Sequence, residues 1–341
     1  MYKIAVMPGD GIGSEVIAEA IKVLNATELE YEQIKCDIGG TAYLKNGNPL
    51  PKESIQACED ADAVLLGAVG HDTVSYDIPR KVLIYLRVEK NAYANIRPFK
   101  TYLHNKKTDH TPIDITIIRD NAEGFSLQHP GMLGKTLGTD RRIITENGAT
   151  RIIEYAIKYA TQHLRKKITC IDQSNWLYSD KLFRETFIKI AENHPTLEND
   201  TMHVDVAAMN ISAHPQKFDV IVTPDIYGDI LSGIIISKIG GIGMPPSASI
   251  GDDFAYFEPI HGPAWDIAEK NTANPIASIL STKLMLEYLQ ETEKAQQIEK
   301  AVTNVLKQGT IRTFDLGGTS TTSEMGDAIA QEVRSISNKR K

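Results

Sequence analysis

Short apolar runs recur along the chain, each long enough for a buried strand and too short for a helix. They occupy residues 4–7, 63–67, 113–118, 168–171 and 219–222. The runs at 4–7 and 63–67 are continuously apolar, as expected of strands that are covered on both faces. The pattern therefore predicts a buried, largely parallel sheet.

Segments with apolar residues at helical spacing alternate with these runs. They cover about residues 15–24, 148–164 and 180–192. Strands that alternate with helices indicate an α/β fold. Because no internal repeat or low-complexity linker interrupts the chain, we expect its first and last parts to share a domain.

Composition narrows the class of protein. The 341 residues carry a net charge of -7, which argues against a nucleic-acid binder. Cys36, Cys58 and Cys170 have no disulfide or metal-site spacing and fit reduced thiols. Neither a signal peptide nor an apolar stretch of membrane-spanning length is evident, so we expect a cytoplasmic protein.

Three arginines lie at predicted loop or strand ends. Arg87 and Arg97 stand ten residues apart, and Arg119 closes the run at 113–118. The guanidinium group binds carboxylates through two parallel hydrogen bonds. Together the three arginines could hold a di- or tricarboxylate, whereas any one alone could simply face water.

Acidic side chains suggest a metal. Asp205 follows a short strand, and Asp225 and Asp229 flank residues 226–228. Such hard oxygen ligands suit Mg²⁺ or Mn²⁺, although loop aspartates also cap helices. The segment 257–275 combines an apolar floor with glycine, histidine and carboxylate, and could cradle an adenosine.

The ordered set of motifs resembles the isocitrate/isopropylmalate dehydrogenase family, the metal- and NAD-dependent β-decarboxylating dehydrogenases. In family order the chain has PGDGIG (8–13), YLR (85–87), NIRP (95–98), IIRDNAEG (117–124), IDQSNWL (171–177), TPDIYGDILSG (223–233) and FEPIHGPAWDIAEKNTANP (257–275). An ordered set over nearly the whole chain is more specific than any single motif.

The resemblance implies an isopropylmalate dehydrogenase-like α/β fold with a parallel or mixed sheet and an active-site cleft between two domains. The implied large NAD-binding domain combines residues 1–92 and 240–341. The small domain, 93–239, would serve dimerisation, substrate and metal. The implied partners are a small hydroxycarboxylate and a second copy of the chain, or a catalytic homologue in a hetero-oligomer, but neither nucleic acid nor membrane.

Residue roles are implied at matching positions. The substrate carboxylates would meet Arg87, Arg97 and Arg119. Mg²⁺ or Mn²⁺ would meet Asp229 and, from the neighbouring subunit, Asp205. The NAD pocket would comprise Ile12, Asn175, Glu258, His261, Gly262, Ala264, Asp266, Ile267 and Asn274. The carboxylate of Asp266 would repel the additional phosphate of NADP, so NAD is favoured.

The departures from the family fall among the catalytic positions, of which Asp229 is kept. Gln173 stands where the family has the lysine that handles the proton of the substrate hydroxyl. Ser126, or Phe125 in a shifted register, stands where the family has a tyrosine, and Gly233 replaces a third metal aspartate. Glutamine cannot titrate, and general acid–base groups contribute about 10²–10⁴-fold each.

Three interpretations remain open. The chain is an NAD-dependent oxidoreductase whose protons move through Asp172, Asp225, Tyr227 or water; a non-catalytic paralogue that binds a carboxylate and a nucleotide; or a dehydrogenase without the enolate step. We favour oxidative decarboxylation of a 2-hydroxy di- or tricarboxylate with altered or weak chemistry.

Residues before Arg87 bear on the substrate. Leu83 and Ile84 resemble the apolar pair that meets the isopropyl group in isopropylmalate dehydrogenases. Arg80 and Lys81 instead suit an extra carboxylate, as in isocitrate or homoisocitrate, or face water. Trp176 replaces a small aliphatic residue and is expected to narrow the same pocket.

Overall fold

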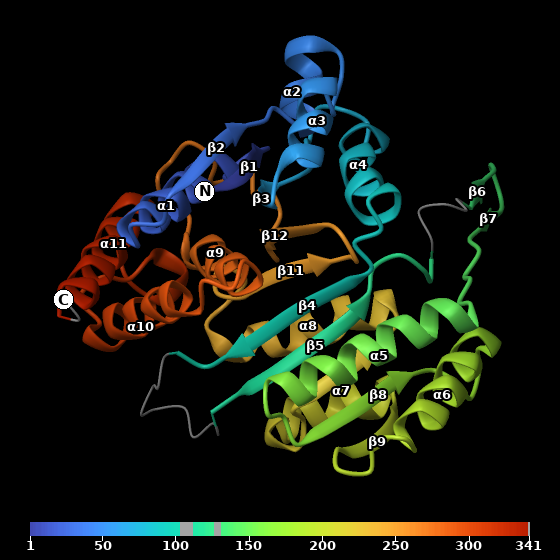
Figure 1. Cartoon of the computed structure of the whole chain (residues 1–341). Coiled ribbons are helices and arrows are strands. Elements are labelled where there is room, and N and C mark those ends of the chain that lie inside the picture. Colours follow the sequence, from blue (N-terminus) through green and yellow to red (C-terminus); the bar gives the residue numbers. More distant parts are fainter. Residues whose placement is uncertain (103–111, 126–130, 340–341) are drawn as a thin grey trace.

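A ten-stranded sheet with helices on both faces organises the part of the chain that the computed structural model describes, residues 1–102, 112–125 and 131–339 (Figure 1). The strand order is β2-β1-β3-β12-β11-β4-β5-β10-β8-β9. The strands of the sheet are β1 (Tyr2–Gly9), β2 (Tyr31–Lys35), β3 (Ala63–Ala68), β4 (Ala94–Lys100), β5 (Asp114–Asp120), β8 (Lys167–Asp172), β9 (Glu198–His203), β10 (Val220–Thr223), β11 (Pro246–Ile250) and β12 (Ala255–Pro259). The predicted α/β fold is confirmed.

The sheet is mixed, because two antiparallel strands join two parallel groups. β2, β1, β3 and β12 run parallel to one another, and so do β5, β10, β8 and β9. β11 and β4 connect the groups through antiparallel pairings. β11 comes from the segment expected in the large domain and β4 from that expected in the small one, so the sheet runs continuously between the two segments.

Helices cover both faces of the sheet (Figure 1). They are α1 (Gly13–Ala26), α2 (Gly39–Asn46), α3 (Lys52–Asp60), α4 (Asp77–Ile84), α5 (Glu146–Gln162), α6 (Tyr178–Ala191), α7 (Val204–Ala213), α8 (Asp225–Ile239), α9 (Ile276–Tyr288), α10 (Thr292–Gln308) and α11 (Thr322–Asn338). A small hairpin of β6 (Met132–Leu133) and β7 (Gly138–Thr139) stands apart from the sheet in Figure 1. No helix in the described ranges is long and apolar enough to cross a bilayer.

Side-chain caps fix the starts of two helices. The hydroxyl of Thr145 accepts a hydrogen bond from the amide of Gly148 and starts α5 two residues before the predicted segment. Thr321 and Glu324 form a reciprocal capping box at the start of α11. These caps satisfy amides that would otherwise lack partners at the first helical turn.

The loop after β1 ties three parts of the chain together. The buried carboxylate of Asp10 accepts hydrogen bonds from the amides of Gly40, Thr41 and Gly70, at 3.0, 2.7 and 2.8 Å. Gly11 has φ of +55°, and a Cβ there would lie 2.0 Å from the carbonyl oxygen of Pro263. Only glycine lets this loop approach the segment 257–275 so closely.

Candidate functional site

Two of the three predicted arginines meet a carboxylate of α8 beside the centre of the sheet. Nη1 of Arg97, on β4, lies 2.7 Å from Oδ1 of Asp229. Nη1 of Arg119, at the end of β5, lies 2.8 Å from Oδ2 of Asp229 and 2.6 Å from Oδ1 of Asp225. Pairing in the sheet and the turn into α8 thus bring together residues that are far apart in the sequence.

Asn95 holds both arginines in place. Its Oδ1 accepts hydrogen bonds from Nε of Arg97 at 2.7 Å and from Nε of Arg119 at 3.2 Å. Its Nδ2 donates to the hydroxyls of Ser247 and Ser249 on β11. Sequence reasoning did not single out Asn95, although it opens the NIRP motif.

Arg87 completes what we call the arginine clamp, defined as Arg87, Arg97 and Arg119. It lies in a single π-helical turn, residues Tyr85–Glu89, directly after α4; such turns are frequent at functional sites. Its Nε donates to the hydroxyl of Tyr256 at 3.1 Å, and its Nη2 lies 3.7 Å from Oε1 of Glu258. Glu258, expected in the NAD pocket, thus lies beside the clamp.

The charges of the clamp act on one another. Burial, followed by repulsion from Arg119, lowers the pKa of Arg97 to about 10. Burial by itself would raise the pKa of Asp229, but Arg119 and Arg97 outweigh it and hold that pKa below its usual value. The clamp therefore favours anionic oxygens, which is the property that recognition of a polycarboxylate requires.

The sequence of α8 fits its place beside the clamp. A Cβ on Gly228 would lie 2.6 Å from Cδ of Arg119, so glycine is needed where the arginine crosses the helix. Asp225, Asp229 and Gly233 follow at intervals of four residues and share one helical face. A Cβ on Gly233 would meet no atom within 4 Å, so the third position on this face is open space.

The metal set is incomplete in one chain. The described ranges contain no group of three or more histidine, cysteine, aspartate or glutamate side chains that could hold an ion. Asp205 lies in the first turn of α7, where its Oδ1 accepts a hydrogen bond from the amide of Val206. The residues of a single chain therefore do not fit a bound Mg²⁺ or Mn²⁺.

Gln173 and Asn175 contact each other. Nε2 of Gln173 donates to Oδ1 of Asn175 at 3.0 Å, and the amide of Gln173 donates to the buried carboxylate of Asp180. Asn175 is exposed and does not line the cofactor cavity described below. Trp176, expected to narrow the substrate pocket, is 80% exposed. Ser126 lies outside the described residues.

Two of the alternative proton carriers are held in buried ion networks. The carboxylate of Asp172 is fully buried and lies 2.8 Å from Nε of Arg184. The hydroxyl of Tyr227 donates to Asp180 at 2.7 Å, and Arg142 lies over the Tyr227 ring and pairs with the same aspartate. Asp225, with a side chain that is 29% exposed, is the carrier that also contacts the clamp.

A separate, mostly apolar cavity of about 460 Å³ contains part of the predicted NAD-binding set, and we call it the cofactor cavity after that prediction. Its lining includes five predicted residues, Ile12, His261, Ala264, Ile267 and Asn274. Asp266 and Gly262 are exposed members of the same loop. Sequence reasoning missed the opposite wall, Phe314, Asp315 and residues 318–321, where the run of glycine, threonine and serine was the only signal.

His261 supplies the test of whether a nucleotide fits this cavity. Its Nε2 is buried without a hydrogen-bond partner among the described residues, and its Nδ1 lies 3.0 Å from the carbonyl oxygen of Gly262. Burial lowers the pKa of this histidine, so the ring stays neutral. An adenosine could supply the missing hydrogen bond, and the residues present therefore fit the nucleotide.

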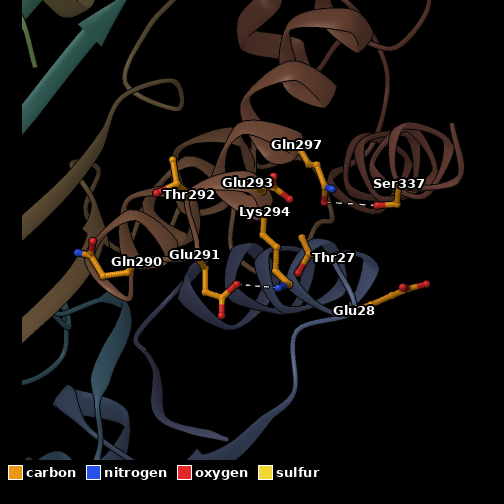
Figure 2. Close-up of a pocket in the computed structure, with 9 residues that line it drawn as sticks. All are labelled: Thr27, Glu28, Gln290, Glu291, Thr292, Glu293, Lys294, Gln297 and Ser337. Atoms are coloured by element: carbon orange, nitrogen blue, oxygen red, sulfur yellow. Dashed lines mark hydrogen bonds and ion pairs between the residues drawn. The ribbon is translucent and has the colours of Figure 1, made fainter. Parts of the chain in front are cut away.

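Another cavity, of about 480 Å³, lies where residues 27–28 after α1 face α10 and α11 (Figure 2). Figure 2 shows its polar walls, in which Lys294 pairs with Glu291 and Gln297 with Ser337. It shares no residue with the clamp or with the cofactor cavity.

Comparison with known proteins adds a family to this geometry. Residues 3–329 match the model of the family described as isocitrate/isopropylmalate dehydrogenase. The chain is 41% identical to the 3-isopropylmalate/3-methylmalate dehydrogenase of Methanocaldococcus jannaschii, over 98% of this chain and 99% of the relative. It is 42% identical to the homoisocitrate dehydrogenase of the same organism, over 98% of both chains. The crystal structure of isocitrate dehydrogenase from Methylococcus capsulatus is similar, with a TM-score of 0.93 and 35% identity over 98% of this chain and 100% of that one.

Proposed function

The chain belongs to the isocitrate/isopropylmalate dehydrogenase family, and on that premise we propose that it oxidises and decarboxylates a 3-substituted malate with NAD. The arginine clamp carries this proposal. A malate-type acid has two carboxylates, and the clamp presents three guanidinium groups whose orientations are fixed by Asn95, Tyr256 and Asp229. Preorganised groups of this kind bind planar carboxylates without a large cost in ordering.

We propose an alkyl substituent on the substrate. Leu83 and Ile84 are half-buried and stand one turn before Arg87, whereas Lys81 is exposed. Arg80 has Asp77 at 3.9 Å and lies over the ring of Tyr76, so part of its charge is already engaged. These contacts favour an apolar group over a third carboxylate.

NAD is the proposed oxidant, and when bound it accepts a hydride from the hydroxyl-bearing carbon. His261 and the apolar walls of the cavity would hold its adenosine. Asp266, exposed in the same loop, disfavours the additional phosphate of NADP.

A second copy of the chain is proposed to complete the site. α7 and α8 expose Val206, Met209 and Ile230, of which Met209 is 63% exposed. Apolar side chains on the outer faces of adjacent helices favour burial against another subunit. We propose that the metal is held by Asp229 of one subunit and Asp205 of the other, with residues 1–92 plus 240–341 and residues 93–239 as the two domains.

The chemistry is proposed to be weak. Gln173 can orient the substrate hydroxyl through hydrogen bonds but cannot take its proton. Asp225 and water remain as acceptors near the clamp. The loss of a titrating lysine therefore predicts slow turnover rather than loss of binding.

The test is a substrate panel with NAD and Mg²⁺ or Mn²⁺, comparing 3-isopropylmalate, 3-methylmalate, homoisocitrate and isocitrate by NADH formation. We expect the alkylmalates to give the higher kcat/KM. Preference for a tricarboxylate would contradict the proposed substituent. No turnover, with thermal stabilisation by these acids and by NAD, would instead support a non-catalytic paralogue.

A further inference from the structure

A third cavity, of about 560 Å³, lies on the face of the sheet opposite the arginine clamp. We propose that this cavity, which we call the tyrosine groove, binds a small zwitterion with an aromatic body, of the class of the aromatic α-amino acids. The groove lies between α5 and α9, over β4 and β11, and Figure 1 shows these two strands passing between the two helices. Its volume is in the usual range for small-molecule sites.

Strand alternation places the clamp and the groove on opposite faces of the same strands. On β4, Asn95 and Arg97 serve the clamp, while Ile96 between them lines the groove. On β11, Ser247 and Ser249 bind Asn95, while Ala248 lines the groove. The floor of the groove is therefore the back of the clamp.

Tyrosines form one wall. The rings of Tyr93 and Tyr155 meet edge to face with centroids 6.1 Å apart, and Tyr159 stacks on His163 at 3.9 Å. The hydroxyl of Tyr159 is engaged with Thr116, whereas that of Tyr155 has no hydrogen-bond partner among the described residues. This wall offers aromatic surface and the phenol of Tyr155 to an aromatic ligand.

The opposite wall comes from another segment of the chain and combines apolar side chains with Glu287 and Gln290. Leu284 and Tyr288 of α9 face the groove, and Phe257 of β12 closes its floor. A ligand between these walls contacts α5, in the middle segment, and α9, in the last segment. It would thereby link the two proposed domains.

Lys158, Asp252 and Glu287 are the charged side chains that line the groove, and one of each sign is left without an ion pair among the described residues. Lys158 on α5 and Asp252, after β11, are exposed and line the groove, and neither forms an ion pair in the described part of the chain. Glu287 is paired with Lys283 at 2.8 Å. A carboxylate facing Lys158 and an ammonium facing Asp252 would satisfy both charges, which a plain anion or cation cannot do.

A ligand that presses on Ile96 and Ala248 also bears on the strands that carry Asn95 and Arg97. We therefore expect occupancy of the groove to change the KM for the hydroxyacid. This coupling rests on the proposed function, whereas the binding itself does not.

The binding test adds L-phenylalanine or L-tryptophan to the intact protein in the absence of substrate. Binding is measured by calorimetry and by the shift in melting temperature. We expect saturable binding, weakened at least fivefold for 3-phenylpropanoate, which lacks the ammonium, and for 2-phenylethylamine, which lacks the carboxylate. Absence of saturable binding by both amino acids overturns the proposal, as does equal binding of all four compounds.

Charge reversal locates the site. Lys158→Glu and Asp252→Lys change exposed side chains and should each weaken binding at least tenfold, whereas Lys307→Glu on α10 should leave it unchanged. Unchanged binding in both groove variants would place the ligand elsewhere and overturn the proposal. If the protein turns over, a threefold change in the KM of the wild type with amino acid present supports the coupling; an unchanged KM removes the coupling but not the site.

Discussion

The cofactor cavity and the carboxylate face of α8 differ in how far they keep the pattern of the family. The cavity brings together five of the expected residues, and one of them, His261, has a buried nitrogen without a hydrogen-bond partner among the described residues. On α8, open space surrounds Gly233, the position at which the resemblance implies a third aspartate, and Gln173, directly after β8, has no titratable group. The proposed function thus assigns ligand recognition to residues that keep the family pattern and proton transfer to positions that depart from it, so binding and turnover should be separable by mutation.

The largest effect is expected from Arg119→Lys. Lysine keeps the charge but loses the planar fork that reaches Asp225, Asp229 and Asn121, so kcat/KM for the hydroxyacid should fall roughly 100-fold. NAD affinity, measured by calorimetry, should be unchanged. Arg165→Lys is the matched control, because Arg165 also binds two carboxylates, Asp114 and Asp219. Equal losses in both variants would mean that the effect is on folding.

Gly233→Asp should restore a metal ligand. The new side chain has room and lies one turn after Asp229, so the affinity for Mn²⁺ should rise about tenfold. Electron paramagnetic resonance measures this affinity. Gly233→Ala controls for the gain in helix propensity and should not change Mn²⁺ binding. A metal affinity that is the same in all three proteins would contradict the place assigned to the ion.

His261→Leu should weaken NAD binding without changing the arginine clamp. Loss of one hydrogen bond in a buried cavity costs about 1 kcal/mol, or roughly fivefold in Kd. The affinity for the hydroxyacid should stay the same. As a control, His194→Leu at an exposed position should change the affinity for neither ligand. If hydroxyacid affinity fell together with NAD affinity, the two sites would not be independent.

Asp120→Asn should change stability and neither ligand affinity. Burial raises the pKa of Asp120 to about 6, so the folded state binds a proton that the unfolded state releases above about 3.8. The stability from this group is present below pH 3.8 and is lost as pH rises through 6. In the variant, the free energy of unfolding should lack this dependence on pH and should be about 1 kcal/mol higher at pH 8 than in the wild type. Urea unfolding at a series of pH values measures both effects. If the variant kept the pH dependence of the wild type, that dependence would have to come from another group.

The sequence predicted where helices and strands lie better than it predicted which strands pair with each other. Runs such as 63–67 are continuously apolar because both faces of β3 are buried, and the helix at 148–164 was found within two residues. The insertion of β12 between β3 and β11 could not be predicted, because pairing of distant strands leaves no local pattern. Motifs identified the arginines, whereas Asn95 and the wall at 314–321 act only through contacts that folding creates.

The pairing of β3 with β12 has a consequence for how the chain is made. β3 ends at Ala68, but its neighbour does not begin until Ala255. A nascent chain therefore carries the bare edge of a hydrophobic strand through most of its synthesis, and such edges are prone to pair with the wrong partner. Because the sheet needs pairings of long sequence separation, we expect slow folding and a long interval in which chaperones can act.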